Sequence, residues 1–283
     1  MEPRTRTCRV IAVVNQKGGV GKTVTATNLG VGLARHGPKV LIVDCDCQAS
    51  QTVSLGWKNP DELPVTLATQ LEKIMANKPF DPQDGILHHD EGIELMPSSI
   101  ELSGLEMRMV NAMSRERLLR TYLDAQKSQY DFIVLDCPPT LGMMTINALA
   151  ATDSVVIPIA PEYLSVVGMQ QLFDTLGMVK QHLNPDLRIE GALVTLANMR
   201  TNLAKNTVGA VQKAYGDDMR VFPTPIPYSV RIKEASTAGQ SIYAYEKGGQ
   251  AAYAYEQLVK EVLRDGRSLG GSEHRNPAET TPR

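Results

Sequence analysis

The chain has 283 residues, of which 42% are hydrophobic and 21% are charged, a composition typical of a soluble globular domain with a full apolar core. Its 29 basic and 31 acidic residues nearly cancel, which excludes a uniformly basic nucleic-acid-binding protein but allows a local basic face. Four cysteines do not make a disulfide framework in a chain of this size, so we expect free thiols in a reducing cytoplasm. No stretch approaches the roughly 20 apolar residues of a membrane span.

Apolar runs alternate with helical patterns, which predicts an α/β fold with a doubly wound, mostly parallel sheet and helices on both faces. The expected strands are 9–15, 40–44, 93–96, 132–136, 154–159, 189–196 and 220–223. The expected helices are 23–36, 66–77, 166–183, 203–215 and 250–264, with further helical sequence between 97 and 129. Between 57 and 92 prolines interrupt the pattern, and we expect His88 and His89 to lie in a solvated loop.

We expect one domain, because no linker divides the sequence between residues 9 and 264. Residues 1–8 form a short N-terminal extension in this interpretation. Residues 265–283 are rich in Gly, Ser, Pro and charge, which predicts a disordered tail. The last predicted helix places apolar residues at helical spacing, which indicates a stripe facing the core.

A phosphate-binding loop follows the strand expected at 9–15. Lys17-Gly18-Gly19-Val20-Gly21-Lys22-Thr23 is a variant of G-x-x-x-x-G-K-[ST], with Gln16 where the standard pattern has its first glycine. The glycines let successive backbone N–H groups turn toward phosphate oxygens. Lys22 can reach the β- and γ-phosphates, and the Thr23 hydroxyl can hold Mg²⁺. The helix that follows points its positive end at the same anion.

Acidic residues close two further predicted strands. The strand at 40–44 ends in Asp44-Cys45-Asp46, and the strand at 132–136 ends in Asp136, as a Walker B segment does. Because ligands bind at the carboxyl ends of parallel strands, we expect these carboxylates beside the phosphate-binding loop. Asp136 would hold Mg²⁺ through water, since Mg²⁺ keeps much of its hydration. The predicted reaction is phosphoryl transfer to water.

These motifs together resemble the ParA/Soj family of deviant Walker A P-loop ATPases, the chromosome- and plasmid-partitioning relatives of MinD. The resemblance covers roughly residues 9 to 264. Two positions depart from the family pattern: Cys47 replaces the usual proline, and Val167 stands where relatives commonly carry glutamate. The segments that carry the resemblance are Lys17–Thr23, Val43–Gln48, Asp136–Gly142, Thr145–Leu149, Glu162–Leu172, Met199–Leu203 and Ile226–Ala235.

The resemblance implies an Mg²⁺-dependent ATPase with ATP and ADP as its nucleotides. Lys17 would reach the partner's phosphates in an ATP-sandwiched homodimer, and Asp46 would position the attacking water while Asp44 braces the site. Catalysis would depend on Lys17, Lys22 and Asp46, and the magnesium site on Thr23 and Asp136. Nucleotide contacts are expected from Lys17, Gly18, Gly19, Val20, Gly21, Lys22, Thr23, Val24, Asn198 and Pro227.

The partitioning branch further implies non-specific binding of duplex DNA by the ATP dimer, in the cytoplasm and on the nucleoid. Hydrolysis would be slow without a ParB-type centromere-binding partner. A dimer doubles the basic patch of one subunit, so a nearly neutral chain can still bind DNA. The candidate DNA-binding residues are Arg200, Lys205, Lys213, Arg231 and Lys233, of which the last two alternate as on one face of a strand.

Two other functions remain open at this level. A MinD-like ATPase on a membrane surface would need a basic amphipathic helix at the C-terminus, and residues 268–283 offer no such helix. A metallocluster-carrying relative, such as a nitrogenase-reductase-like electron donor, has Cys45, Cys47 and Cys137 as its one hint. We therefore expect a partitioning ATPase without a membrane partner.

Overall fold

The computed structural model describes residues 8–160, 163–198, 209, 212–213 and 219–269. Within this part of the chain, strands form one sheet in the order β3-β4-β2-β5-β1-β6-β7. All neighbours pair in parallel except β3, which is antiparallel to β4. The strands are β1 (Arg9–Val13), β2 (Val40–Asp44), β3 (Leu87–His89), β4 (Ile93–Met96), β5 (Phe132–Asp136), β6 (Ser154–Ile159) and β7 (Arg188–Val194).

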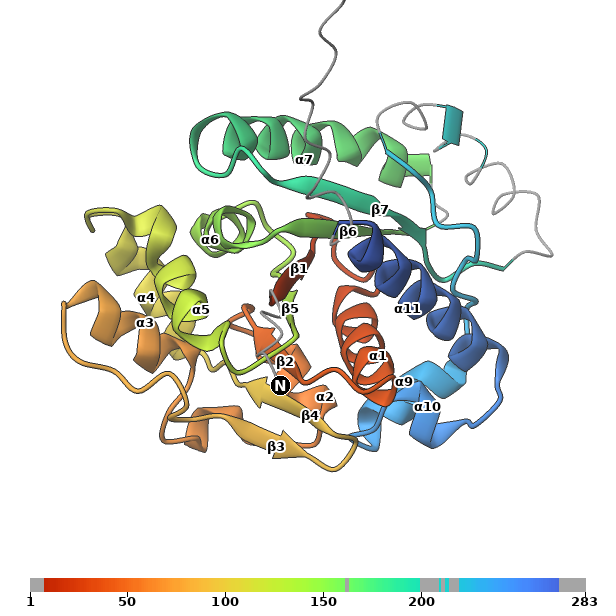
Figure 1. Ribbon diagram of the computed structural model, residues 1–283, viewed down its shortest axis with the longest axis horizontal. Coiled ribbons are helices and arrows are strands. Elements are labelled where there is room, and N and C mark those ends of the chain that lie inside the picture. Colours follow the sequence, from red (N-terminus) through yellow and green to blue (C-terminus); the bar gives the residue numbers. More distant parts are fainter. Residues whose placement is uncertain (1–7, 161–162, 199–208, 210–211, 214–218, 270–283) are drawn as a thin grey trace, which may run out of the picture.

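Helices cover both faces of the sheet (Figure 1), as the sequence predicts. Short 3₁₀ helices occur at η1 (Pro60–Glu62) and η2 (Arg115–Arg117). The α-helices in the described part are α1 (Lys22–Arg35), α2 (Ser50–Ser54), α3 (Leu67–Met75), α4 (Glu101–Met109), α5 (Leu118–Gln126), α6 (Met143–Ala151), α7 (Tyr163–His182), α9 (Val230–Thr237), α10 (Ile242–Tyr245) and α11 (Gln250–Leu269).

Alternating residues of the central strands enter two separate apolar cores. Val10 and Ala12 of β1 face a core that α3, α4, α5, α6 and α7 complete. Ile11 and Val13 face the opposite core, which α1 and α11 complete. All four side chains are fully buried. A strand covered on both faces needs apolar residues at every position, which explains why these strands read as unbroken apolar runs.

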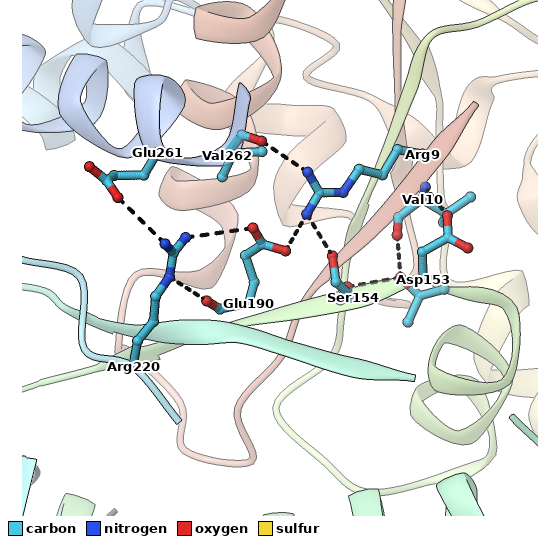
Figure 2. Close-up of polar contacts among 9 residues, drawn as sticks. Arg9, Val10, Asp153, Ser154, Glu190, Arg220, Glu261 and Val262 are labelled. Atoms are coloured by element: carbon cyan, nitrogen blue, oxygen red, sulfur yellow. Dashed lines mark hydrogen bonds and ion pairs between the residues drawn. The ribbon is translucent and has the colours of Figure 1, made fainter. Parts of the chain in front are cut away.

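A charged network fastens α11 to the amino end of the sheet (Figure 2). Arg9 donates a hydrogen bond to the main-chain oxygen of Val262 (2.9 Å) and pairs with Glu190 of β7. Arg220 bridges the carboxylates of Glu190 (3.6 Å) and Glu261 (3.5 Å). Glu190 has a side chain only 5% exposed, so two arginines compensate one buried carboxylate. The network ties β1, β7 and α11 together at the end of β1 remote from the phosphate-binding loop.

The structure corrects several local predictions. His88 and His89 lie in the edge strand β3 and not in a loop. Val221 forms an isolated bridge with Ala192, so the strand expected at 220–223 is reduced to a single pairing. The helix expected to end at 264 continues to Leu269. Residues 265–269 of the disordered tail expected at 265–283 are therefore helical, and the rest of that tail lies outside the described residues, as does most of the helix expected at 203–215.

Candidate functional site

The phosphate-binding loop joins the end of β1 to the start of α1. Gly19 (φ +73°) and Gly21 (φ +83°) have left-handed backbone conformations, which glycine adopts without the penalty of a side chain. A Cβ placed on Gly18 or Gly19 would meet nothing within 4 Å. The strain is therefore in the backbone turn itself, and the space over these glycines is open to a ligand. Gly21 is also the N-cap of α1, so the helix end points into this loop.

Lys22 is held inside the loop. The residue is 7% exposed, and its Nζ donates a hydrogen bond to the main-chain oxygen of Lys17 (2.9 Å). Burial lowers the pKa of Lys22, while the Asp136 carboxylate opposes that shift. A cation that is buried and directed across the loop is suited to bind phosphate, because little of its hydration remains to be removed.

Two residues outside the predicted motif fix the loop from the neighbouring strands. The Asn15 side chain donates to the main-chain oxygen of Pro158 in β6 (2.7 Å) and accepts from the N–H of Lys17 (3.0 Å). The Thr195 hydroxyl, just beyond β7, donates to the main-chain oxygen of Val20 (2.7 Å). The sequence signal for both was their position at the carboxyl end of a strand, where polar residues gather around ligands.

The two predicted carboxylates meet because of the strand order. β2 and β5 are neighbours, with Asp44 and Asp136 in register, and Val13 at the end of β1 is in register with Asp136. Asp44 is fully buried and accepts hydrogen bonds from the Thr52 N–H (2.9 Å), the Thr52 hydroxyl (2.8 Å) and the Asp46 N–H (3.2 Å). Burial raises the pKa of Asp44 to about 7 despite the hydrogen bonds from Thr52.

Asp136 has the features of a cation ligand. It is 1% exposed, and neither carboxylate oxygen accepts a hydrogen bond of normal geometry in the described part of the chain, although the Thr23 hydroxyl is close enough to act on it. Burial raises its pKa well above the ordinary value and Asp44 adds to the shift, whereas Thr23 and Lys22 oppose it. An unpartnered buried carboxylate is costly unless a ligand compensates it, so these residues fit Mg²⁺, which prefers oxygen ligands.

Asp46 lies in the segment that connects β2 to α2. Its carboxylate accepts from the N–H of Gln48 (3.0 Å), and its carbonyl accepts from the N–H of Ala49 (2.9 Å). The side chain is half-buried, in contrast to the buried Asp44. Cys47, which replaces the usual proline, is half-buried beside it. Asp46 therefore lies on the exposed side of the acidic pair, on a turn that Asp44 braces through the backbone.

The two adenine candidates come from segments that lie next to each other. Ala197 pairs with Pro227 in a parallel bridge, and the Tyr228 N–H donates to the Ala197 oxygen (3.2 Å). Asn198, the next residue, is exposed, and Pro227 is half-buried. This pairing follows β7 and Thr195, whose hydroxyl donates to the Val20 oxygen of the loop. Val24 is half-buried in the first turn of α1.

The DNA-binding candidates are only partly covered by the structure. Arg200 and Lys205 lie outside the described residues, and Lys213 is exposed. Arg231 and Lys233 are exposed on the helix α9, so the expectation of a strand there is wrong. Ser229 caps that helix by accepting from the Arg231 N–H (3.2 Å), and Ile232 and Ala235 pack its other face.

The cysteines do not form a cluster centre. Cys45 and Cys137 are buried in the apolar core, where burial raises the pKa of both thiols. Among the residues that the structure describes, no group of three or more His, Cys, Asp or Glu side chains is arranged to hold a metal ion. The cysteine positions thus give no support to a metallocluster carrier.

Comparison with known proteins gives the family. A family model described as an AAA domain matches residues 8–189. The sporulation initiation inhibitor protein Soj of Bacillus subtilis is 42% identical over 91% of this chain and 99% of its own length. The chromosome partitioning protein ParA of Myxococcus xanthus is 38% identical over 90% of this chain and 88% of its own. The chain belongs to the ParA/Soj family of P-loop ATPases.

Solved structures with the same fold bind nucleotide. The cobyrinic acid a,c-diamide synthase of Mycobacterium smegmatis, with ADP and magnesium, superposes on this ParA/Soj protein with a TM-score of 0.81 at 34% identity, covering 93% of this chain and 96% of that one. The septum site-determining protein MinD of Pyrococcus horikoshii, complexed with Mg-ADP, gives 0.72 at 25% identity, covering 95% and 100%. The predicted fold class and family are confirmed.

Proposed function

We propose that this ParA/Soj protein is a DNA-partitioning ATPase. In this proposal ATP binding drives sandwich dimerisation and non-specific binding of duplex DNA, and hydrolysis, stimulated by a ParB-type partner, reverses both. The observation that carries the proposal is the 42% identity to Soj along 99% of that protein. The open glycine loop, the buried Lys22 and the unpartnered Asp136 carboxylate support it.

In the proposed mechanism, the N–H groups of the glycine loop and the Lys22 ammonium bind the β- and γ-phosphates. Thr23 and Asp136 would hold Mg²⁺, which would supply positive charge to the phosphate oxygens. Asp46 orients the attacking water from the exposed side of the site. Asp44 keeps the Asp46 turn in place through the Asp46 N–H.

Lys17 has a separate role in this proposal. It reaches the phosphates of the partner subunit, so that the dimer supplies a cation that a monomer lacks, as an arginine finger does. Its position supports this role, because its N–H and carbonyl are fixed by Asn15 and Lys22 at the rim of the loop and its side chain is half-buried there. Nucleotide binding and dimerisation would then be one linked equilibrium.

The proposed hydrolysis is slow without a partner, which the acid–base groups of the site support. Asp44 is engaged by three hydrogen bonds, so it acts as a brace and leaves water positioning to Asp46. Positioning and charge stabilisation dominate phosphoryl transfer, so a partner that completes the site can raise the rate. We propose a ParB-type protein as that partner, because chromosome partitioning is the activity named for the M. xanthus relative.

The MinD-like alternative is disfavoured by the packing of the C-terminal helix. The apolar residues of α11, including Tyr255, Leu258, Val259 and Val262, are buried against α1 and the sheet. A membrane-binding helix must leave its apolar face free. Within the described ranges, no helix is both long and apolar enough to cross a membrane. We propose the nucleoid as the site of action, because the apolar face of α11 is already buried within the domain.

The deciding experiment measures binding of the purified protein to a long duplex DNA without nucleotide, with ADP and with ATP, each with Mg²⁺. We expect retention on DNA with ATP alone, and retention that weakens steeply as salt rises, because counterion release drives the binding. Equal binding in all three conditions would contradict the nucleotide switch.

Asp46→Ala tests the assigned role of the water-positioning residue. We expect this variant to bind ATP, to dimerise and to remain on DNA, because the phosphate and magnesium ligands are intact. Asp90→Ala, which removes an exposed acidic residue in the β3–β4 turn, serves as the control. ATP hydrolysis by Asp46→Ala at the wild-type rate would show that Asp46 does not position the water.

A further inference from the structure

Glu106 of α4 connects the outer helical layer to the segment that leaves Asp136. The helix α4 is fixed in the core by Leu102, Leu105 and Met109, which are fully buried. Glu106 lies between two of these anchors, and its side chain is half-buried. Its Oε1 accepts a hydrogen bond from the N–H of Met144 (2.9 Å), in the first turn of α6.

The helix α6 depends on this contact because it has no cap of its own. Gly142 occupies the N-cap position and offers no side chain, and α6 has no local side-chain cap. The first N–H groups of a helix lack partners within the helix, and a carboxylate there is also stabilised by the helix dipole. Glu106 supplies both the acceptor and the negative charge from a different helix.

The capped start of α6 is also the end of the segment that follows Asp136, the residue assigned to magnesium. Residues 137–142 run from Asp136 directly to the start of α6, and Pro138 and Pro139 have no N–H with which to fix that path. The segment is close to Glu106: a Cβ on Gly142 would lie 3.6 Å from Glu106 Oε1. The Thr145 hydroxyl of α6 donates a hydrogen bond to the main-chain oxygen of Thr140 (2.6 Å). This bond links the first turn of α6 to the segment 137–142.

Glu106 also lies near the other acidic segment. Its charge contributes to the raised pKa of Cys47, for which burial is the main cause, and Cys47 directly follows Asp46. The Glu106 charge therefore acts on the turn after β2, while its hydrogen bond is made to the segment after β5. These two turns carry the residues that we assign to water positioning and to magnesium.

We propose that Glu106 is a positioning residue for ATP hydrolysis, which rests on the ATPase function proposed above. By capping α6 at Met144 it fixes the 137–142 segment and so holds Asp136 at the geometry that the reaction needs. Lys22 and the glycine loop come from β1 and α1, so Glu106 does not support ground-state binding of the phosphates. Loss of the cap should consequently lower kcat and leave KM for ATP nearly unchanged.

Three substitutions separate this role from a simple stabilising role. Glu106→Ala removes the acceptor, and Glu106→Asp keeps the charge but is one methylene too short to reach Met144. Glu106→Gln keeps an oxygen that can accept the same hydrogen bond and loses only the charge. We expect kcat to fall roughly ten- to hundredfold in the Ala and Asp variants, with KM within about twofold, and to stay within about threefold of wild type in the Gln variant.

A second measurement does not depend on catalysis. Amide hydrogen exchange of peptides covering residues 137–150 should be faster in the Ala and Asp variants and close to wild type in the Gln variant. Glu101→Ala, which removes an exposed glutamate from the first turn of the same helix, should change neither exchange in this segment nor kcat. If the Ala variant is too unstable to assay, the Asp and Gln pair carries the comparison.

Wild-type kcat in folded Glu106→Ala or Glu106→Asp would overturn the proposal, as would a Gln variant as slow as the Ala variant. Faster exchange with unchanged kcat would reduce Glu106 to a structural cap and would also overturn it. Absence of ATP hydrolysis by the wild-type protein would instead contradict the proposed ATPase function. The two failures are thus distinguishable.

Discussion

Replacement of Asp44 by asparagine should change how the stability of the nucleotide-free protein depends on pH. Asp44 is fully buried, and burial raises its pKa from 3.8 to about 7. Between these values the folded protein keeps a proton that the unfolded chain has released. The free energy of unfolding therefore falls as pH rises through this window, because the folded state binds more protons there.

The size of the effect follows from the two pKa values. A shift of one unit corresponds to 1.36 kcal/mol, so Asp44 contributes a loss of at most about 4 kcal/mol between pH 4 and pH 7, of which about 2 kcal/mol falls between pH 5 and pH 7. The side chain introduced by Asp44→Asn does not titrate. It keeps an oxygen for Thr52 but presents an amide N–H to the Asp46 N–H, which adds a pH-independent cost of about 1–3 kcal/mol.

The assay is urea unfolding at intervals from pH 5 to pH 8, with a chelator and without nucleotide. The quantity to compare is the difference between wild type and Asp44→Asn, since groups that titrate alike in both proteins cancel; Asp136, whose pKa the Asp44 charge raises, is part of the measured difference. We expect the difference in free energy of unfolding between wild type and Asp44→Asn to decrease as pH rises to 7. A difference that does not change with pH, or that changes in the opposite direction, would refute the assignment of a protonated Asp44. Asp90→Asn, at an exposed position, should follow wild type throughout.

Further predictions concern the loop and its packing. Lys22→Ala should lower the affinity for ATP in a direct binding assay by at least about tenfold, because hydrogen bonds to charged groups contribute ~1.5–3 kcal/mol. The control Lys58→Ala, at an exposed position, should bind ATP with wild-type affinity. Unchanged ATP affinity of Lys22→Ala would contradict the assignment of Lys22 to the phosphate site. Lys17→Gln should still bind ATP but remain a monomer in ATP by light scattering and fail to bind DNA; an ATP-dependent dimer would contradict its role in trans. Gly32→Ala should lower the free energy of urea unfolding by about 1–3 kcal/mol, because the new Cβ would lie 2.5 Å from Val259 Cγ2. Gly177→Ala, with no atom within 4 Å of its Cβ, should not destabilise the protein.

Local sequence was sufficient for the parts of the site that lie within one strand–turn–helix unit. The glycine positions and Lys22 could be predicted because a loop of this type contacts phosphate mainly through its own backbone and its own lysine. The buried strands could be predicted because both faces of β1, β2 and β5 are covered by helices. Such strands need apolar residues at every position and so appear as unbroken apolar runs. The acidic residues at the strand ends followed from the rule that parallel sheets bind ligands at their carboxyl edge.

Short elements with weak hydrophobic patterns could not be predicted from the sequence. Val230-Arg231-Ile232-Lys233 alternates like a strand, yet it begins the helix α9, since Ser229 caps it and Ile232 and Ala235 find a common apolar surface. His88 and His89 carry no apolar pattern and still form β3, because the exposed edge of β4 offers a partner. In both cases tertiary contacts outweigh a small local preference.

The sequence by itself determined the family, the phosphate-binding loop and the identities of the acidic residues, because each depends on neighbouring positions in the chain. Only the tertiary structure decided that Asp44 and Asp136 lie side by side, since the pairing of β2 with β5 joins segments about 90 residues apart. It also decided which residues hold the loop and the acidic turns from outside: Asn15, Thr195, Thr52 and Glu106. Strand order and helix contacts between distant segments arise from the packing of the whole core, and no local period encodes them.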